Sequence, residues 1–487
     1  MKRGYIFGIA LAFGIGPLNL AISQPANSDS TGTNAPTIEE LKAGAEKGDA
    51  TAQFKLAAAY FNGQNVAQNY PQAVFWLRKA ADQNFAPAQC NLGWCYENGL
   101  GVATDTVAAV TLYCQAASQD YAQAECNLGA CYEHGAGVIQ DFNMALTWYR
   151  KAARQNCASA EDNLGIDYFN GHGVSLNYKK AVQWFRKAAD QSYPDAQFNL
   201  GRCYESGLGV ASDPAQAVKW YRLASAQNNA DAECNLANCY LNGSGLAPDP
   251  KEAVKLYRQA AAQNDAAALC DLGNCYANGQ GVPKDETEAV KCYNQAAAQN
   301  NIEAECNLAI RFLNGNGVAK NEAQAVALFL KAAGQNSPVA QDYLGICYAG
   351  GRGVNRDDAQ AVKWFQKAAA QNNADSQYNL AIACAHGTGV KQDYADAAKW
   401  FQKAAEQDDP RAQYGLGVCY ATGVGLRQDF VQAYKWSALA SLHGVSNAGE
   451  ILVRVQNAMT EDQIAEGKRL VAEFKPASPP PSPSIAN

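Results

Sequence analysis

Leucine recurs at 36-residue intervals along most of the chain. A glycine follows seven residues after each leucine, and an aromatic residue follows four residues after it in every copy except the tenth, which has Cys384. No insertion interrupts the series, so each copy must pack on the next in one fixed geometry. The eleven leucines are Leu56, Leu92, Leu128, Leu164, Leu200, Leu236, Leu272, Leu308, Leu344, Leu380 and Leu416.

Each copy predicts two helices joined by a glycine-containing turn. In the sixth copy, Ala232, Leu236 and Tyr240 are spaced four residues apart, so they share one face of a helix. Gly243 suits the left-handed position that ends a helix. Asp249 is a suitable N-cap for the second helix, and the equivalent residue is Asp or Asn in all eleven copies. The pattern therefore predicts an all-α protein made of helix pairs.

The segments that flank the copies predict helical caps. We assign residues 50–441 to the repeats and residues 37–49, which open with a capping-box pattern, to an N-terminal capping helix. Residues 442–474 predict C-terminal capping helices, which a solenoid needs to end in water. The Pro/Ser composition of residues 475–487 predicts a disordered tail.

The first residues of the chain predict a secretory signal. Lys2 and Arg3 precede an apolar stretch, and a small-x-small pattern favours cleavage before Gln24. We therefore interpret residues 1–23 as a signal peptide and residues 24–36 as a linker. This interpretation predicts a periplasmic or secreted protein with no integral membrane span after cleavage.

The repeat resembles the Sel1-like repeat family, a branch of the tetratricopeptide-like helical repeats. The resemblance lies in the pattern A-x-x-N-L-G-x-x-Y-x-x-G-x-G-V followed by D-x-x-x-A-x-x-W-[YF]-x-K-A-A, which residues 124–138 and 145–153 fit nearly throughout. It implies a right-handed α/α superhelical solenoid of eleven 36-residue helix-turn-helix repeats, with the first helices lining the concave side. It also implies a role in protein–protein contacts.

Composition and motif content exclude several classes of function. The net charge of −7 argues against nucleic-acid binding, which requires a basic face. No Ser-x-x-Lys motif occurs, and the four histidines, His134, His172, His386 and His443, lie in separate repeats. We therefore predict no catalytic residues, no metal ligands and no cofactor. An envelope hydrolase of the β-lactamase-like or penicillin-binding kind, as linked to cysteine-rich relatives, and a secreted effector that engages host proteins remain the alternatives.

The sixteen cysteines leave several interpretations open. One set, which includes Cys95 and Cys131, directly precedes the aromatic residue on the predicted buried face, where Cys acts as a small apolar side chain. A second set, which includes Cys90 and Cys126, lies five residues earlier. Packing thiols, some disulfides and metal ligation are all compatible with this pattern, and an exported protein would meet oxidising conditions.

A candidate binding strip follows from aligning the first helices on tetratricopeptide geometry. It comprises Trp94, Glu97, Asn127, Glu133, Asn163, Asn199 and Arg202. Trp and Arg are enriched where binding energy concentrates, and the acids favour a basic partner. In peptide-clamping relatives the matching Asn binds the ligand backbone; alternatively, it only ties adjacent first helices together. We predict a non-enzymatic scaffold or adaptor that binds a protein or peptide partner on its concave face, and the oligomeric state is left open.

Overall fold

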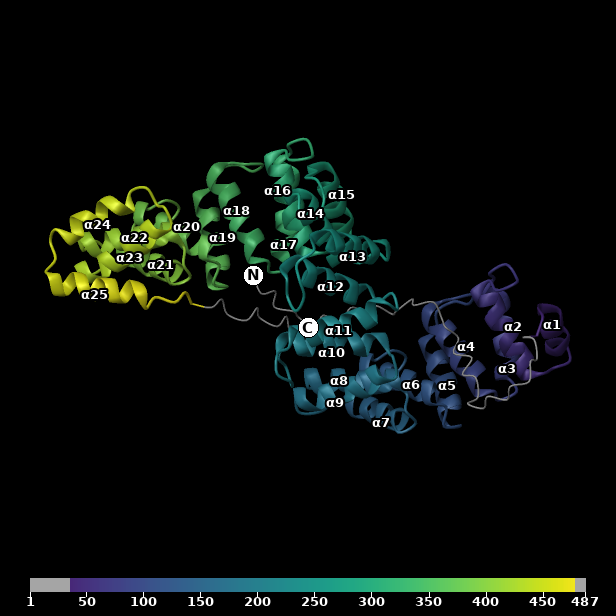
Figure 1. Ribbon diagram of the computed structural model, residues 1–487. Coiled ribbons are helices and arrows are strands. Elements are labelled where there is room, and N and C mark those ends of the chain that lie inside the picture. Colours follow the sequence, from purple (N-terminus) through teal and green to yellow (C-terminus); the bar gives the residue numbers. More distant parts are fainter. Residues whose placement is uncertain (1–35, 478–487) are drawn as a thin grey trace. The chain divides into compact units, whose positions relative to one another are not determined.

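The computed structural model describes residues 36–477, and every regular element within that range is an α-helix. The predicted all-α fold of paired helices is therefore confirmed (Figure 1). The predicted signal peptide and nearly all of the predicted linker and tail lie outside the described residues. The described helices form two compact units, residues 36–249 and residues 250–477.

The N-terminal unit contains α1 to α12. Their bounds are α1 Ile38–Glu46, α2 Ala50–Asn62, α3 Tyr70–Ala81, α4 Ala86–Asn98, α5 Thr106–Ala117, α6 Ala122–His134, α7 Phe142–Ala153, α8 Ala158–Asn170, α9 Tyr178–Asp190, α10 Pro194–Ser206, α11 Pro214–Ser225 and α12 Ala230–Asn242. The first helix of each repeat has an even number and the second helix an odd one.

The C-terminal unit contains α13 to α25. Their bounds are α13 Pro250–Ala262, α14 Ala266–Asn278, α15 Glu286–Ala298, α16 Ile302–Asn314, α17 Glu322–Gly334, α18 Pro338–Gly350, α19 Asp358–Ala370, α20 Ala374–His386, α21 Tyr394–Glu406, α22 Pro410–Thr422, α23 Phe430–Leu442, α24 Ala448–Gln456 and α25 Glu461–Ala472.

Local sequence fixes where these helices begin and end. Each first helix ends at a glycine in the left-handed conformation, with φ between 63° and 81°. Ten second helices begin with an Asp or Asn whose side chain accepts a hydrogen bond from a backbone N–H of the first turn, as the sequence predicted. These N-caps are Asn69, Asp105, Asp141, Asn177, Asp213, Asp285, Asn321, Asp357, Asp393 and Asp429.

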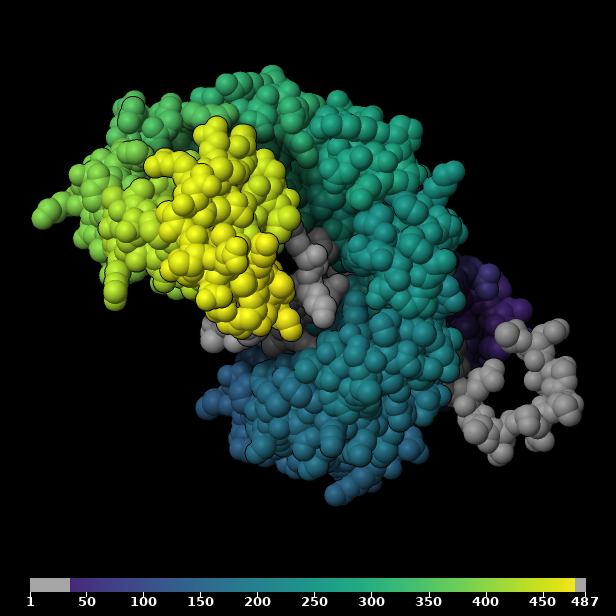
Figure 2. Space-filling model, turned by 60° about the vertical axis from the view of Figure 1, so that its left-hand side comes forward, coloured from purple at the N-terminus to yellow at the C-terminus, as the bar shows by residue number. Residues whose placement is uncertain are grey.

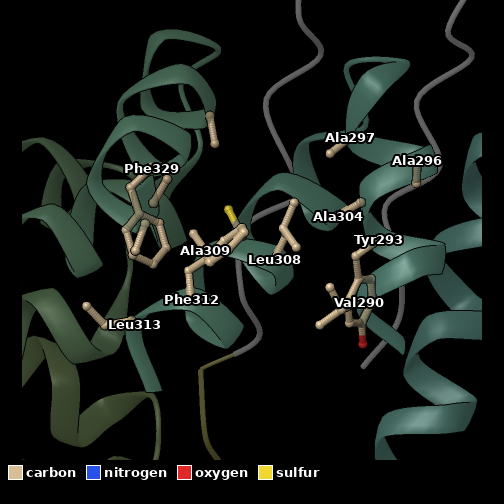
Figure 3. Packing of buried hydrophobic residues seen from close by; sticks show 14 of the residues in the cluster. Val290, Tyr293, Ala296, Ala297, Ala304, Leu308, Ala309, Phe312, Leu313 and Phe329 are labelled. Carbon is tan, nitrogen blue, oxygen red and sulfur yellow. The ribbon is translucent and has the colours of Figure 1, made fainter. Parts of the chain in front are cut away.

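The recurring leucines form the centre of each repeat, and none is more than 6% exposed. Figure 3 shows the arrangement in the C-terminal unit, where Leu308 and Ala309 of α16 lie between Tyr293 of α15 and Phe329 of α17. Within each unit, first helices such as α16 pack on their own second helix and on the helix that precedes them in the chain. The buried residues of each unit form several hydrophobic clusters, each of which spans neighbouring helices.

A glycine in each turn brings neighbouring repeats into close contact. Gly209, with φ +78°, lies against the first residue of α9 in the preceding repeat, and a Cβ there would clash with the carbonyl of Tyr178. No other residue type combines this conformation with this approach. The first repeat has Asn65 in the matching left-handed position.

A ladder of partly buried amides and carboxylates closes eight of the repeats on themselves. A glutamine just after the second helix donates a hydrogen bond to a Gln or Glu that lies 30 residues earlier in the first helix, as Gln155 Nε2 does to Glu125 Oε2 at 2.8 Å. The same bond occurs in eight repeats. In the third repeat, Lys151 Nζ also lies 2.9 Å from the buried Glu125 carboxylate.

Short helices cover both ends. The capping box of α1, formed by Thr37 and Glu40, is present, and α1 packs on α2. At the other end α24 and α25 both pack on α23, and α25 begins with a capping box of Thr460 and Gln463. In the space-filling view these two helices form the yellow surface at the end of the C-terminal unit (Figure 2). Among residues 36–477, no helix has both the length and the apolar character needed to cross a bilayer.

Candidate functional site

The first helices of the second to eleventh repeats leave one row of side chains half-buried, two residues after each leucine. We call this row the open row. In the N-terminal unit it comprises Trp94, Ala130, Ile166, Arg202 and Asn238, and in the C-terminal unit it comprises Asn274, Ile310, Ile346, Ile382 and Val418. Two of the predicted partner-binding residues, Trp94 and Arg202, therefore belong to the same row.

Trp94 differs from every other tryptophan in the chain. Seven of the eight tryptophans lie in second helices, and each has a lysine Nζ within 4.0–5.6 Å of its ring centroid, as Lys187 has over Trp184. Trp94 lies in the first helix α4, with its ring edge-on to Phe61 at 5.8 Å. A cavity of only ≈ 10 Å³ lies beside it, about the space of one water molecule.

Arg202 extends from α10, with its guanidinium 5.6 Å from the ring centroid of Phe198 in the same helix. Burial lowers the pKa of Arg202, while acidic groups including Asp231 and Glu205 oppose the shift. An arginine stays charged at neutral pH in any case. The N-terminal open row therefore presents an aromatic ring at one end and a cation three repeats later.

The two acids of the predicted binding strip, Glu97 and Glu133, are less accessible than the sequence suggested. Glu133 is only 8% exposed, and its Oε2 accepts a hydrogen bond of 2.7 Å from the hydroxyl of Tyr149 in α7. Glu97 is half-buried and accepts the same bond from Tyr113 at 2.6 Å. The prediction that Glu133 is an exposed acid is therefore wrong, because the carboxylate satisfies a tyrosine hydroxyl that the core would otherwise leave without a partner.

The sequence does contain a signal for this role. A tyrosine follows each of these glutamates 16 residues later, in the middle of the second helix, and Glu205 with Tyr221 repeats the pair at 2.7 Å. In the fourth repeat the matching residues are Phe169 and Phe185, so the carboxylate and the hydroxyl are lost together.

The asparagines of the predicted strip connect neighbouring repeats. Asn127 and Asn163 donate to the thiol sulfurs of Cys90 and Cys126, 37 residues earlier, at 3.6 and 3.7 Å. Asn199 is buried and donates to Asp162 Oδ1 at 3.0 Å. The structure thus shows the alternative that the sequence left open, in which this Asn ties adjacent first helices. Its placement also removes Asn199 from the surface.

All sixteen cysteines lie within the described residues, and the structure holds each of them as a thiol. Thirteen are buried, and burial raises the pKa of Cys95 and of Cys131 to about 12. Cys157 differs, because a hydrogen bond from the Cys126 thiol, aided by Ser159, lowers its pKa. Its sulfur lies 3.3 Å from Ser159 Oγ, which donates to Cys126 at 3.4 Å.

One group of side chains converges that the sequence analysis did not bring together. Glu133 of α6, Asp167 of α8 and His172 of the turn after α8 each present a potential ligand atom within 4.8 Å of the other two. Burial, followed by the charge of Glu133, raises the pKa of Asp167 to about 8. Single-repeat reasoning missed this group because its members come from two neighbouring repeats.

Comparison with known proteins agrees with the fold. The Sel1 repeat family model matches eleven consecutive segments, from residues 50–85 to residues 410–445. A protective antigen of uropathogenic Escherichia coli strains with an SLR fold is 35% identical, with a TM-score of 0.65 over 90% of this chain and 94% of that one. A Sel1 repeat protein from Oxalobacter formigenes is 31% identical, with a TM-score of 0.44 over 64% of this chain and 90% of that one. A search of curated proteins found no match. Because the family model covers most of the chain, this protein belongs to the Sel1 repeat family.

Proposed function

We propose that this protein is a non-enzymatic scaffold that binds an extended polypeptide along the open row of its N-terminal unit. Sel1 repeats are commonly protein-interaction scaffolds, which supports the general class. The observation that carries the specific proposal is Trp94, the one tryptophan placed on a first helix and half-buried there. Amphipathic aromatic side chains in such positions are typical anchors of protein interfaces.

The spacing of the open row fits an extended chain. Packed helix layers are about 8–10 Å apart, and an extended polypeptide advances about 3.3 Å per residue, so each repeat would face about three residues of the partner. Trp94 would take an apolar side chain and Arg202 an acidic group of the partner. Glu133 and Asn199 have no part in this contact because both are buried.

A binding experiment tests this proposal. A peptide selected from a displayed random library on the full chain is measured against the Trp94→Ala variant and against a matched control, Trp184→Ala, on a second helix. Loss of an anchor tryptophan costs about 2 kcal/mol or more, which is roughly a 30-fold rise in Kd. We expect that rise for Trp94→Ala alone. An unchanged Kd for Trp94→Ala, or an equal loss for Trp184→Ala, would contradict the proposal.

We propose a periplasmic or secreted location for this scaffold. The support is the signal-like pattern of residues 1–23, together with a relative that is described as a protective antigen. Cell fractionation tests the location. Nitrocefin turnover by the purified chain tests the β-lactamase-like alternative, and we expect no hydrolysis above that of a buffer blank.

A further inference from the structure

Asp167 is an acidic residue in a row of buried thiols. The position three residues after the leucine is Cys95, Cys131, Cys203, Cys239, Cys275, Cys347 or Cys419 in seven other repeats. Asp167 occupies it in the fourth repeat and is only 1% exposed. A buried carboxylate is costly unless it is paired or bound to a cation, so this departure from the period requires a physical reason.

The protein groups around Asp167 do not compensate for the burial of its carboxylate. Its Oδ2 has no hydrogen-bond partner, and a second buried carboxylate, Glu133, has an oxygen within 4.8 Å of the Asp167 carboxylate. The positive charge of Arg150 favours the ionised form of Asp167, but Arg150 itself is exposed on α7. Two carboxylates that face each other inside a protein favour either a shared proton or a bound cation.

A histidine completes the group. Gly171 and Gly173 flank His172, both with positive φ, and its ring packs on Phe142 with the centroids 5.1 Å apart. His172 Nδ1 is buried and has no hydrogen-bond partner. It lies 3.7 Å from Glu133 Oε1 and 4.0 Å from Asp167 Oδ1.

These distances suit a shared metal better than direct hydrogen bonds. They exceed the 2.7–3.2 Å range of an N–H···O bond. Two ligand atoms bound to one tetrahedral Zn²⁺ at about 2.0–2.2 Å each lie about 3.3–3.6 Å apart, so the side chains need to close in by only a few tenths of an ångström to bind one ion. Glu133 Oε1 is available as a ligand because the Tyr149 hydroxyl binds Oε2 and thereby orients the carboxylate.

We propose that Glu133, Asp167 and His172 form a binding site for one divalent transition-metal ion of the Zn²⁺ type, which joins the third and fourth repeats. One imidazole nitrogen and two carboxylate oxygens are ligands that Zn²⁺ accepts, whereas Ca²⁺ requires six to eight oxygens. Three protein ligands leave a coordination position for water or for a donor atom of a partner.

The chain itself provides conservative variants for the test. His172→Ala installs the residue that the third repeat has at the same position, Ala136, and Asp167→Ala installs the residue of the tenth repeat, Ala383. His134→Ala removes an exposed histidine that ends α6 and serves as the matched control. Circular dichroism in the absence of metal verifies that each variant is folded.

Calorimetric titration of the chelator-treated full chain with Zn²⁺ measures the site. We expect about one Zn²⁺ per chain. His172→Ala should weaken binding more than about 10-fold, because even the loss of an outer-shell partner costs about 10–100-fold in metal affinity. Asp167→Ala should do the same, and His134→Ala should bind like the unmodified chain. Absence of binding to the unmodified chain, or an unchanged affinity in His172→Ala, would overturn the proposal.

Co²⁺ is a second probe that separates this site from adventitious binding to the cysteines. Nitrogen and oxygen ligands give ligand-field bands without a thiolate-to-metal charge-transfer band. We expect those bands in the unmodified chain and their loss in His172→Ala. A charge-transfer band that persists in His172→Ala would assign the metal to thiols and overturn the proposal.

Discussion

Asp162 shows how one buried ionisable residue makes stability depend on pH. The matching position holds Cys in five repeats, and burial raises the pKa of Asp162 to about 8 despite the hydrogen bond from Asn199. The unfolded chain loses this proton near the ordinary value of 3.8. Between these values the folded state binds more protons than the unfolded state, so stability falls as pH rises from about 4 to about 8.

We expect Asp162→Asn to remove this dependence. The variant keeps an oxygen that can accept from Asn199, and it carries no charge at any pH. Relative to the unmodified chain, its free energy of unfolding should rise between pH 5 and pH 9, by at most about 1.4 kcal/mol for each pH unit of that interval. Urea denaturation at both pH values measures the difference. The exposed Asp190→Asn variant is the control, and an equal pH effect there would refute the assignment.

The reactivity of the thiols provides a second test at this scale. Because the pKa of Cys157 is lowered and the pKa of the more exposed Cys114 is raised by burial, Cys157 has the larger thiolate fraction of the two at neutral pH. Iodoacetamide at pH 7 should therefore modify Cys157 first, as followed by peptide mass spectrometry. Cys126→Ala should slow this reaction, because it removes the hydrogen bond that lowers the pKa of Cys157. Faster modification of Cys114 at pH 7 would show that exposure governs reactivity here.

At the scale of the element, stability depends on the packing of each first helix between two second helices. Leu200 of α10 has no exposed surface, whereas Leu223 of α11 is 42% exposed. Leu200→Ala should lower the free energy of unfolding by about 2–5 kcal/mol, because it leaves a cavity, and Leu223→Ala should lower it far less. Denaturant unfolding measures both.

The damage from Leu200→Ala should be local. Repeats contact only their neighbours, so hydrogen exchange should accelerate in α8 to α11 and stay unchanged in α1 and α2. Uniform acceleration along the N-terminal unit would show that the unit unfolds as one cooperative block.

At the scale of the whole molecule, the sequence predicted the repeats well because every determinant of a helix pair lies within 36 residues. The leucine, the terminal glycine and the N-cap of Asp or Asn act over one or two helical turns, and they recur in register. The helix-pair repeat therefore followed from local physics, whereas the Sel1 family followed from the resemblance of its motif. The roles of single side chains did not, because each depends on a partner in the other helix or in the next repeat.

Glu133 and His172 illustrate this limit. Helical spacing alone places Glu133 beside the open row, and only the tyrosine 16 residues later identifies it as a partner of a buried hydroxyl. His172 is the only histidine of its repeat, and its neighbours become visible when the preceding repeat is packed against it. By contrast Trp94 was predicted to be accessible and is half-buried on its helix, so its binding role stays a prediction.

The unbroken 36-residue period also affects how such a protein can evolve. Because the glutamine ladder closes adjacent repeats such as the third and fourth on themselves, in-frame loss or duplication of one such repeat recreates an equivalent junction. Changes of this kind alter length but add no new chemistry. New chemistry arises instead from single substitutions at positions that the repeat otherwise keeps constant. Asp167 is an example, because its position holds Cys in seven other repeats. Related chains would therefore differ mainly at the positions that depart from the repeat, while their helix pairs would remain interchangeable.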